Sequence, residues 1–425
     1  MSVSAIGPEV SLGEGARRQN ALSLLLFLLI SVALLTRFCI TPALMNRMVD
    51  YTSESGAFYE KLHFGTYAIM LLLPLALFSR PLFLRGDEIG KFRALLRYCL
   101  LLVVLVVFLI GSGRAGSSGT YIDTYLIAGA AGLTMFTVNE DLRRMVGNVV
   151  LVVLLTSAMM GLFEAVTQTR ILPFGLTELT FRPTGLTDHP LTLGMTCAAG
   201  IGFVALARWR TWVKVAGIFL LFIGAAASGA RFSLLLAAVE IFALLIFVPW
   251  PQLSRRHERQ AKFVVLMITL VGGALLTAVL LAGGLLSRFG DTIFDENAAA
   301  RITIYRIFEF TGIKELLFGA DLNAIARIVK DKLGLPYIES TPVYLIYQLG
   351  LPLALAFAVL VFSIFGRMLR GAPRTAWIAT GIFFVTALSN NILSSKTPVV
   401  AMFLVLIIAF GTSRAPVAET EATPT

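Results

Sequence analysis

The chain alternates long apolar stretches with short polar connections, many of them basic, from one end to the other. Apolar runs of about 18 or more residues recur, and each is long enough to cross a hydrocarbon layer of roughly 30 Å. The pattern therefore predicts an all-α polytopic membrane protein. About twelve spans are expected, at residues 21–40, 64–84, 94–112, 121–138, 145–165, 189–207, 213–228, 232–249, 263–286, 341–365, 375–393 and 397–412.

The longest interval between predicted spans is the loop at 287–340. Within it, residues 301–310 and 321–332 carry apolar side chains at helical spacing, which predicts two short amphipathic helices lying against the membrane surface. We expect residues 21–412 to form a single transmembrane domain between two tails, 1–20 and 413–425.

Basic residues indicate the orientation, because short cytoplasmic loops carry an excess of Lys and Arg. With a cytoplasmic N-terminus, 20 of the 35 Lys and Arg residues fall at inner connections and 8 at short outer ones, while seven lie in the 287–340 loop. An even number of spans places both termini in the cytoplasm. The predicted location is a bacterial inner membrane, with the long loop in the periplasm.

Composition supports a membrane protein and argues against a nucleic-acid partner. The apolar set makes up 57% of the 425 residues, charged residues only 14%, and the mean hydropathy is +0.84, more than one soluble core can hide. The net charge is +10, and the basic residues lie in short clusters between the predicted spans, where they indicate the orientation of the spans. Cys39, Cys99 and Cys197 show no C-x-x-C spacing, so neither a disulfide nor a metal site is expected.

The first candidate segment runs from Arg182 to Gly194 on the predicted outer side. Pro190 suits the first turn of a helix and Asp188 its cap. A helix N-terminus beside Arg182 is a favourable place for an anion. Alternatively, Arg182 and His189 anchor the span at the headgroup level.

The second candidate is Arg231, which follows three small residues in a tight outer turn. A lone arginine there runs against the positive-inside pattern. It either reaches lipid phosphates or clamps a phosphate or pyrophosphate with its planar guanidinium.

The third candidate segment is the long loop, with Arg301 and Arg306 near its start and Glu339 where it re-enters the membrane. Desolvation there would make Glu339 a useful base. It is equally compatible with an acid placed near the positive end of a helix.

These motifs resemble those of the O-antigen ligase and O-antigen or exopolysaccharide polymerase superfamily of bacterial membrane glycosyltransferases. The likeness is carried by Arg182…Gly185…His189-Pro190…Gly194, by Ser228-Gly229-Ala230-Arg231, and by Arg301…Tyr305 continuing to Leu317-Phe318-Gly319. The sequence departs from the family pattern at Leu191, Ala230, Tyr305 and Asp321.

The resemblance implies a glycosyltransferase C-type fold and transfer of a glycan from an undecaprenyl-diphosphate carrier to an acceptor sugar, without metal or cofactor. Glu339 and His189 would be catalytic, and Arg182, Arg231, Arg301 and Arg306 would bind the diphosphate. Lipid-linked donor, glycan acceptor and membrane lipids would be its partners, with a flippase and a chain-length regulator in the same system.

Ligases of this family carry a histidine near the end of the loop, where this chain has Glu339 to Pro342. A polymerase is therefore preferred over a ligase that transfers to lipid A core. Twelve spans also suit a lipid-linked glycan flippase, and such transporters carry ionisable residues near the bilayer midplane.

Overall fold

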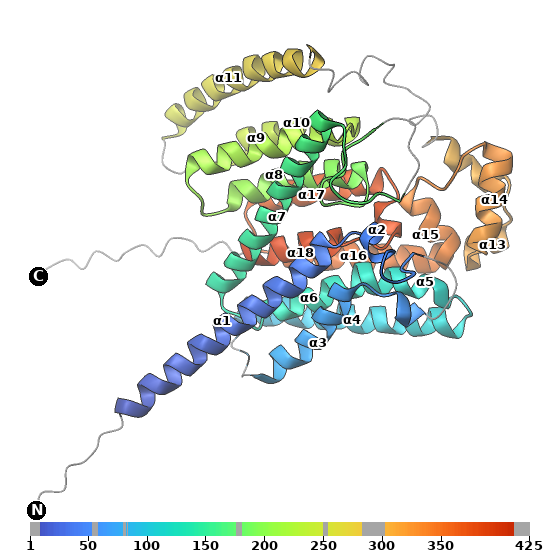
Figure 1. Cartoon of the computed structure of the whole chain (residues 1–425), viewed down its shortest axis with the longest axis horizontal. Coiled ribbons are helices and arrows are strands. Elements are labelled where there is room, and N and C mark those ends of the chain that lie inside the picture. The colour runs from blue at the N-terminus through green and yellow to red at the C-terminus, as the bar shows by residue number, and fades with distance from the viewer. Residues whose placement is uncertain are drawn as a thin grey trace, which may run out of the picture.

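All regular elements in the described part of the chain are helices (Figure 1). The computed structural model describes residues 9–52, 58–79, 82, 84–175, 181–249, 254–282 and 302–411. The longer helices are α1 (Glu9–Cys39), α3 (Phe64–Ser79), α4 (Gly86–Gly111), α6 (Ile127–Met135), α7 (Glu140–Thr167), α8 (Pro190–Leu206), α9 (Thr211–Ala227), α10 (Arg231–Phe247), α11 (Arg255–Ala282), α14 (Leu322–Leu333), α15 (Thr341–Leu349), α16 (Leu351–Met368), α17 (Arg374–Leu388) and α18 (Val399–Phe410). Short helices are α2 (Pro42–Met45), η1 (Phe58–Lys61), α5 (Ala115–Thr120), the π-helix η2 (Tyr121–Leu126), η4 (Ile304–Glu309), α13 (Ile313–Phe318) and η5 (Ile392–Ser394).

Four described helices, α1, α4, α7 and α16, are long and apolar enough to cross a membrane by length and composition. Helices α3, α8, α9, α17 and α18 are apolar but shorter. The all-helical structure is consistent with the helical membrane protein that the apolar pattern predicts.

Each predicted span overlaps a described helix, but the 341–365 stretch is divided in two. Gly350 separates α15 from α16 with a φ of +84°, a conformation that favours glycine. A Cβ at this position would also collide with the carbonyl of Leu317. The chain therefore breaks between two apolar segments, and α16 alone has membrane-spanning length.

The centre of the bundle consists of α6, α8 and α18, whose residues are almost all buried. Glycines let neighbouring helices approach α8, as small residues do in membrane helix pairs. A Cβ on Gly202 would lie 2.5 Å from the Glu240 carboxylate of α10 and 2.8 Å from Ala379 of α17. The Gly202 amide instead donates a hydrogen bond of 3.0 Å to Glu240. This core fixes the helix ends on which the candidate site is built.

The described residues 302–340 form a small unit at the side of the bundle away from the first turns of α1 (Figure 1). Its two expected helices exist as η4 and α14. Their apolar positions face each other and α15, because Ile304, Ile325 and Val329 are buried in a separate small core. The expectation that α14 lays its apolar face on the membrane is therefore corrected: protein covers that face.

Candidate functional site

A buried carboxylate holds the segment that leads into α8. Glu164, near the end of α7, is fully buried. It accepts hydrogen bonds from the backbone amides of Thr184 (2.7 Å), Gly185 (2.9 Å) and Ile171 (3.0 Å). Charge-assisted bonds of this kind are stronger than neutral ones. Glu164 thus ties both ends of the connection between α7 and α8 to the bundle.

Gly185 allows this segment to lie directly against α7. Its φ is +56°, in the region that residues with a Cβ rarely adopt. A Cβ there would overlap the Ser157 carbonyl oxygen. The following amide, of Leu186, donates to the Ser157 hydroxyl at 3.1 Å. The glycine of the sequence motif is therefore required by a close backbone contact.

His189 is the N-cap of α8 and lies just outside the helix. Its Nδ1 accepts a hydrogen bond from the Leu191 amide at 3.1 Å, and Pro190 occupies the first helical turn. Because Nδ1 is an acceptor, a neutral His189 carries its proton on Nε2. This side chain is then arranged to donate a hydrogen bond through Nε2, so a role as proton acceptor would require the cap to break.

The Arg182 segment and the Arg231 turn meet at the start of α8. The Arg182 Nε donates to the Ser228 carbonyl at 3.4 Å. A Cβ on Gly194 would lie 2.7 Å from Ala230 and 2.8 Å from the Ser228 hydroxyl, so the turn rests on the first turns of α8. Arg231 is the first residue of α10 and is half-buried. Two of the three predicted segments are therefore adjacent.

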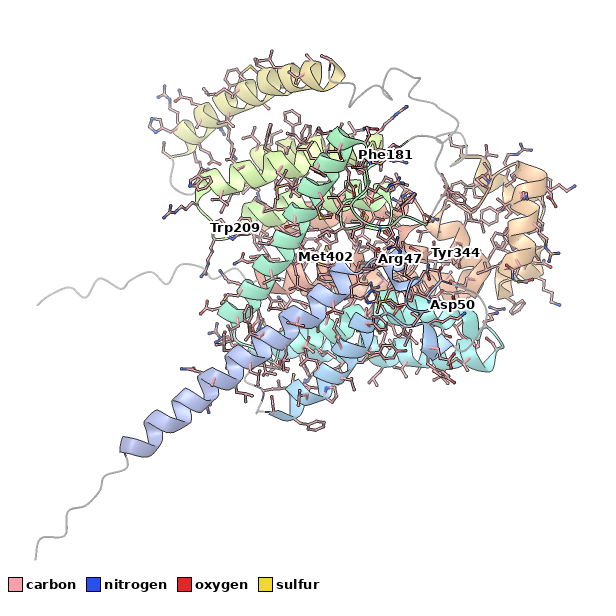
Figure 2. All side chains as sticks on the ribbon, in the orientation of Figure 1. Arg47, Asp50, Phe181, Trp209, Tyr344 and Met402 are labelled. Carbon is pink, nitrogen blue, oxygen red and sulfur yellow. The ribbon has the colours of Figure 1, made fainter. Side chains whose placement is uncertain are left out.

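Arg170 adds a third guanidinium to this region. It donates to the Arg182 carbonyl at 3.1 Å and lies over the rings of Phe174 (3.8 Å) and Phe181 (5.1 Å); Phe181 is labelled in Figure 2. Burial, together with the positive charges of Arg182 and Arg170, lowers the pKa of His189 to about 4. The imidazole is thus neutral at physiological pH and sits in a positive field that favours an anion.

The long-loop candidates lie in the small unit around η4 and α14. Arg306 is exposed and pairs with Glu309 at 3.5 Å. Glu339 is half-buried and precedes Ser340, the N-cap of α15. The hydroxyl of Thr341 anchors this helix start by donating to the Asn390 carbonyl at 2.7 Å. Arg301 lies outside the described residues.

Sequence reasoning missed a buried polar cluster centred on Asp123, which we call the Asp123 cluster. The Asp123 carboxylate is fully buried in the π-helix η2. It accepts bonds from the hydroxyls of Tyr51 (2.8 Å) and Thr66 (2.7 Å) and from the His63 amide (3.2 Å). The Arg37 guanidinium donates to the Asp123 carbonyl at 2.9 Å. Single π-turns of this kind are frequent at functional sites.

Lys396 connects the same cluster to the break before α18. Its Nζ donates to the carbonyls of Tyr51 and Lys61, both at 2.8 Å, and lies 4.4 Å from the centre of the Tyr51 ring. Burial chiefly lowers the pKa of Lys396, and the Asp123 charge opposes this. Arg37 and Asp123 fall inside the predicted spans 21–40 and 121–138. An ionisable residue within an apolar run is the signal that identifies them.

A small cavity of about 20 Å³, room for roughly one water, lies next to Asp188. Its walls come from the end of α1, from α7, and from the starts of α8 and α18. Asp188 is half-buried. Burial raises the pKa of Asp188, against the opposing effects of hydrogen bonds, including that of Thr192, and the nearby Arg37. A carboxyl with a raised pKa is a second candidate for a base beside His189.

The chain matches no known protein-family model, and no curated protein matches it. Within the described ranges, no group of three or more His, Cys, Asp or Glu side chains is placed to hold a metal ion.

Proposed function

We propose that the chain is an inner-membrane glycosyltransferase that polymerises lipid-linked glycan repeat units. In this proposal the twelve predicted spans cross the membrane with both termini in the cytoplasm, and the fold is of the glycosyltransferase C type. The main support is the meeting of Arg182 and the Arg231 turn at the N-terminus of α8.

The arrangement suits a diphosphate leaving group. Guanidinium groups and the Nε2–H of His189 would face the phosphate oxygens, where negative charge grows as the bond between sugar C1 and phosphate oxygen breaks. The acceptor hydroxyl forms the new bond to C1 and gives its proton to a carboxylate. Glu339 is the first candidate for this carboxylate and Asp188 the second. His189 then acts as a donor to the diphosphate.

Substitution of Arg231 tests the clamp. We expect Arg231→Ala to lower polymer formation by about a hundredfold, the usual cost of losing one charge-stabilising donor, and Arg231→Lys to restore little because the planar fork is lost. Polymer length on gels and the pool of lipid-linked repeat units are measured together. The control is Arg327→Ala, an exposed position on α14. Full-length polymer with Arg231→Ala at normal membrane level contradicts the clamp.

The same measurements assign the base. Glu339→Gln stops transfer if Glu339 takes the proton, whereas Asp188→Asn stops it if Asp188 does. Repeat units should accumulate on the lipid in the inactive variant.

A flippase is the second candidate, and the Asp123 cluster is the observation that favours it. Ionisable residues inside membrane helices often mark transport pathways. Movement of a lipid-linked glycan across liposomes containing the purified protein, without any new glycosidic bond, would replace the polymerase proposal.

A further inference from the structure

The small unit at 302–340 hides one apolar face and exposes another. The apolar side of α14 is covered, since Ile325 and Val329 are buried against η4 and α15. By contrast, Ile313 and Phe318 of α13 are 75% and 67% exposed. Further large apolar side chains exposed on this unit are Ile302, Tyr305 and Phe310. An exposed group of this kind marks an interaction surface.

The position of α13 is fixed at one end of the bundle. Arg114, which follows α4, donates to the Phe318 carbonyl at 2.7 Å and to the Gln348 carbonyl at 3.0 Å. The Ala320 amide donates to the Tyr347 carbonyl at 2.7 Å. These bonds hold the end of α13 beside the C-terminal end of α4 and next to α15 and α16. The exposed side chains therefore cannot turn away without breaking them.

Helix α13 lies next to two helices, α4 and α16, that also expose apolar side chains. Both of these helices have membrane-spanning length and apolar composition. Val104 and Val107 of α4 are exposed, as are Leu355 and Val359 of α16. Helix α13 contacts α16 and is bonded through Arg114 to the end of α4, so a bilayer that surrounds these two helices would border on α13.

We propose that α13 inserts into the boundary between headgroups and acyl chains, with Phe318 and Ile313 as its anchors. Aromatic side chains are enriched at this depth, and interfacial helices bury their apolar face there. The described residues 302–340 carry five basic and five acidic side chains, so their net formal charge is zero. Attraction to the bilayer is therefore apolar and does not depend on anionic lipid. This inference is independent of the enzymatic proposal.

Spin labels on cysteine substitutions test the insertion in phosphatidylcholine liposomes. Phe318→Cys and Ile313→Cys carry the probes, and Ala326→Cys, exposed on α14, is the control. The unsubstituted chain corrects for labelling of Cys39, Cys99 and Cys197. We expect a water-soluble nickel chelate to relax the labels at 313 and 318 several-fold less than the label at 326, while oxygen relaxes them more.

Equal nickel accessibility at positions 318 and 326 would overturn the proposal. If Phe318→Cys does not reach the liposomes, Ile313→Cys alone decides. Replacing half of the phosphatidylcholine with phosphatidylglycerol should leave the accessibilities unchanged. A clear increase in depth with the anionic lipid would show that charge, and not apolar burial, drives the contact.

Discussion

The Asp123 cluster and the Arg182–Arg231 region are both built around charged side chains, but they use them differently. In the cluster, Asp123 accepts bonds at 2.7–3.2 Å from groups buried around it. At the start of α8, Arg170 and Arg182 donate to backbone carbonyls. In that region the Glu164 carboxylate accepts hydrogen bonds from backbone amides.

The cluster thus uses charge structurally, whereas the proposed function assigns the arginines a binding use. A charge enclosed by matched partners stabilises one arrangement of helices, and loss of one partner leaves the others buried and unsatisfied. A half-buried guanidinium held by carbonyls keeps its positive field, and the charges of Arg182 and Arg170 add to the effect of burial in lowering the pKa of His189. Substitutions in the cluster should therefore reduce stability, and those at the arginines should reduce activity.

The largest effect is expected from Asp123→Asn. The amide cannot accept all the bonds that the carboxylate accepts, and each buried group left unsatisfied costs about 1–3 kcal/mol. The total should reach several kcal/mol and lower both the membrane level and the melting temperature. Asp141→Asn, an exposed acid in the first turn of α7, should cost less than about 1 kcal/mol. Similar melting temperatures for the two variants would show that the cluster is not structural.

An intermediate effect is expected from Gly185→Ala. Forcing alanine to a positive φ costs about 1–3 kcal/mol, and the Ser157 carbonyl occupies the space of the new Cβ. The segment should shift and carry Arg182 with it, so activity falls together with the melting temperature. Gly175→Ala is the matched control in the same connection, because nothing lies within 4 Å of its Cβ. A wild-type melting curve for Gly185→Ala would contradict the close contact.

The smallest effect is expected in the titration of His189. Its folded pKa is about 4, below the unfolded value of about 6.5, so the unfolded chain binds this proton first. The contribution of His189 to stability is complete above pH 6.5 and declines as the pH falls toward 4. Arg182→Ala should raise the pKa by removing a positive charge. NMR of labelled histidine measures this pKa, and an unchanged value in Arg182→Ala would show that the Arg182 charge does not contribute to it.

The helical architecture was predictable because a long run of apolar residues is a local property of the sequence and can be recognised without knowing any long-range contact. The division at Gly350 was not predicted, since Leu349 and Leu351 continue the apolar run and the contact with the Leu317 carbonyl is not visible in the sequence. The amphipathic pattern of α14 was likewise visible, but a pattern does not state whether lipid or protein covers the apolar face. Here Ile304 and the start of α15 cover it.

The candidate site was predictable where its residues lie in short motifs. Arg182, His189 and Arg231 were singled out by the order of their motifs, and the structure places the Arg182 segment beside the Arg231 turn. The partners of Asp123 were not found, because Tyr51 and Thr66 lie 72 and 57 residues away and no periodic pattern connects them. In the sequence, Glu164 was visible only as an acid at the edge of a predicted span. Its partners are backbone amides, which leave no signal in the sequence because nearly every residue has one.

The bond from Lys396 to the Tyr51 carbonyl joins residues that are 345 positions apart. Because the ribosome makes the chain from the N-terminus, this bond can form only when synthesis is almost complete. Arg37 and Asp123 leave the ribosome long before Lys396, so in the proposed topology they enter the bilayer while the last contributor to their cluster does not yet exist. Thr124 depends in the same way on the late segment, since it donates to the Ser395 carbonyl at 2.8 Å. Completion of the final helix thus closes the structure that the first helices begin, and a chain shortened before residue 396 should be recognised by membrane quality control as unfinished.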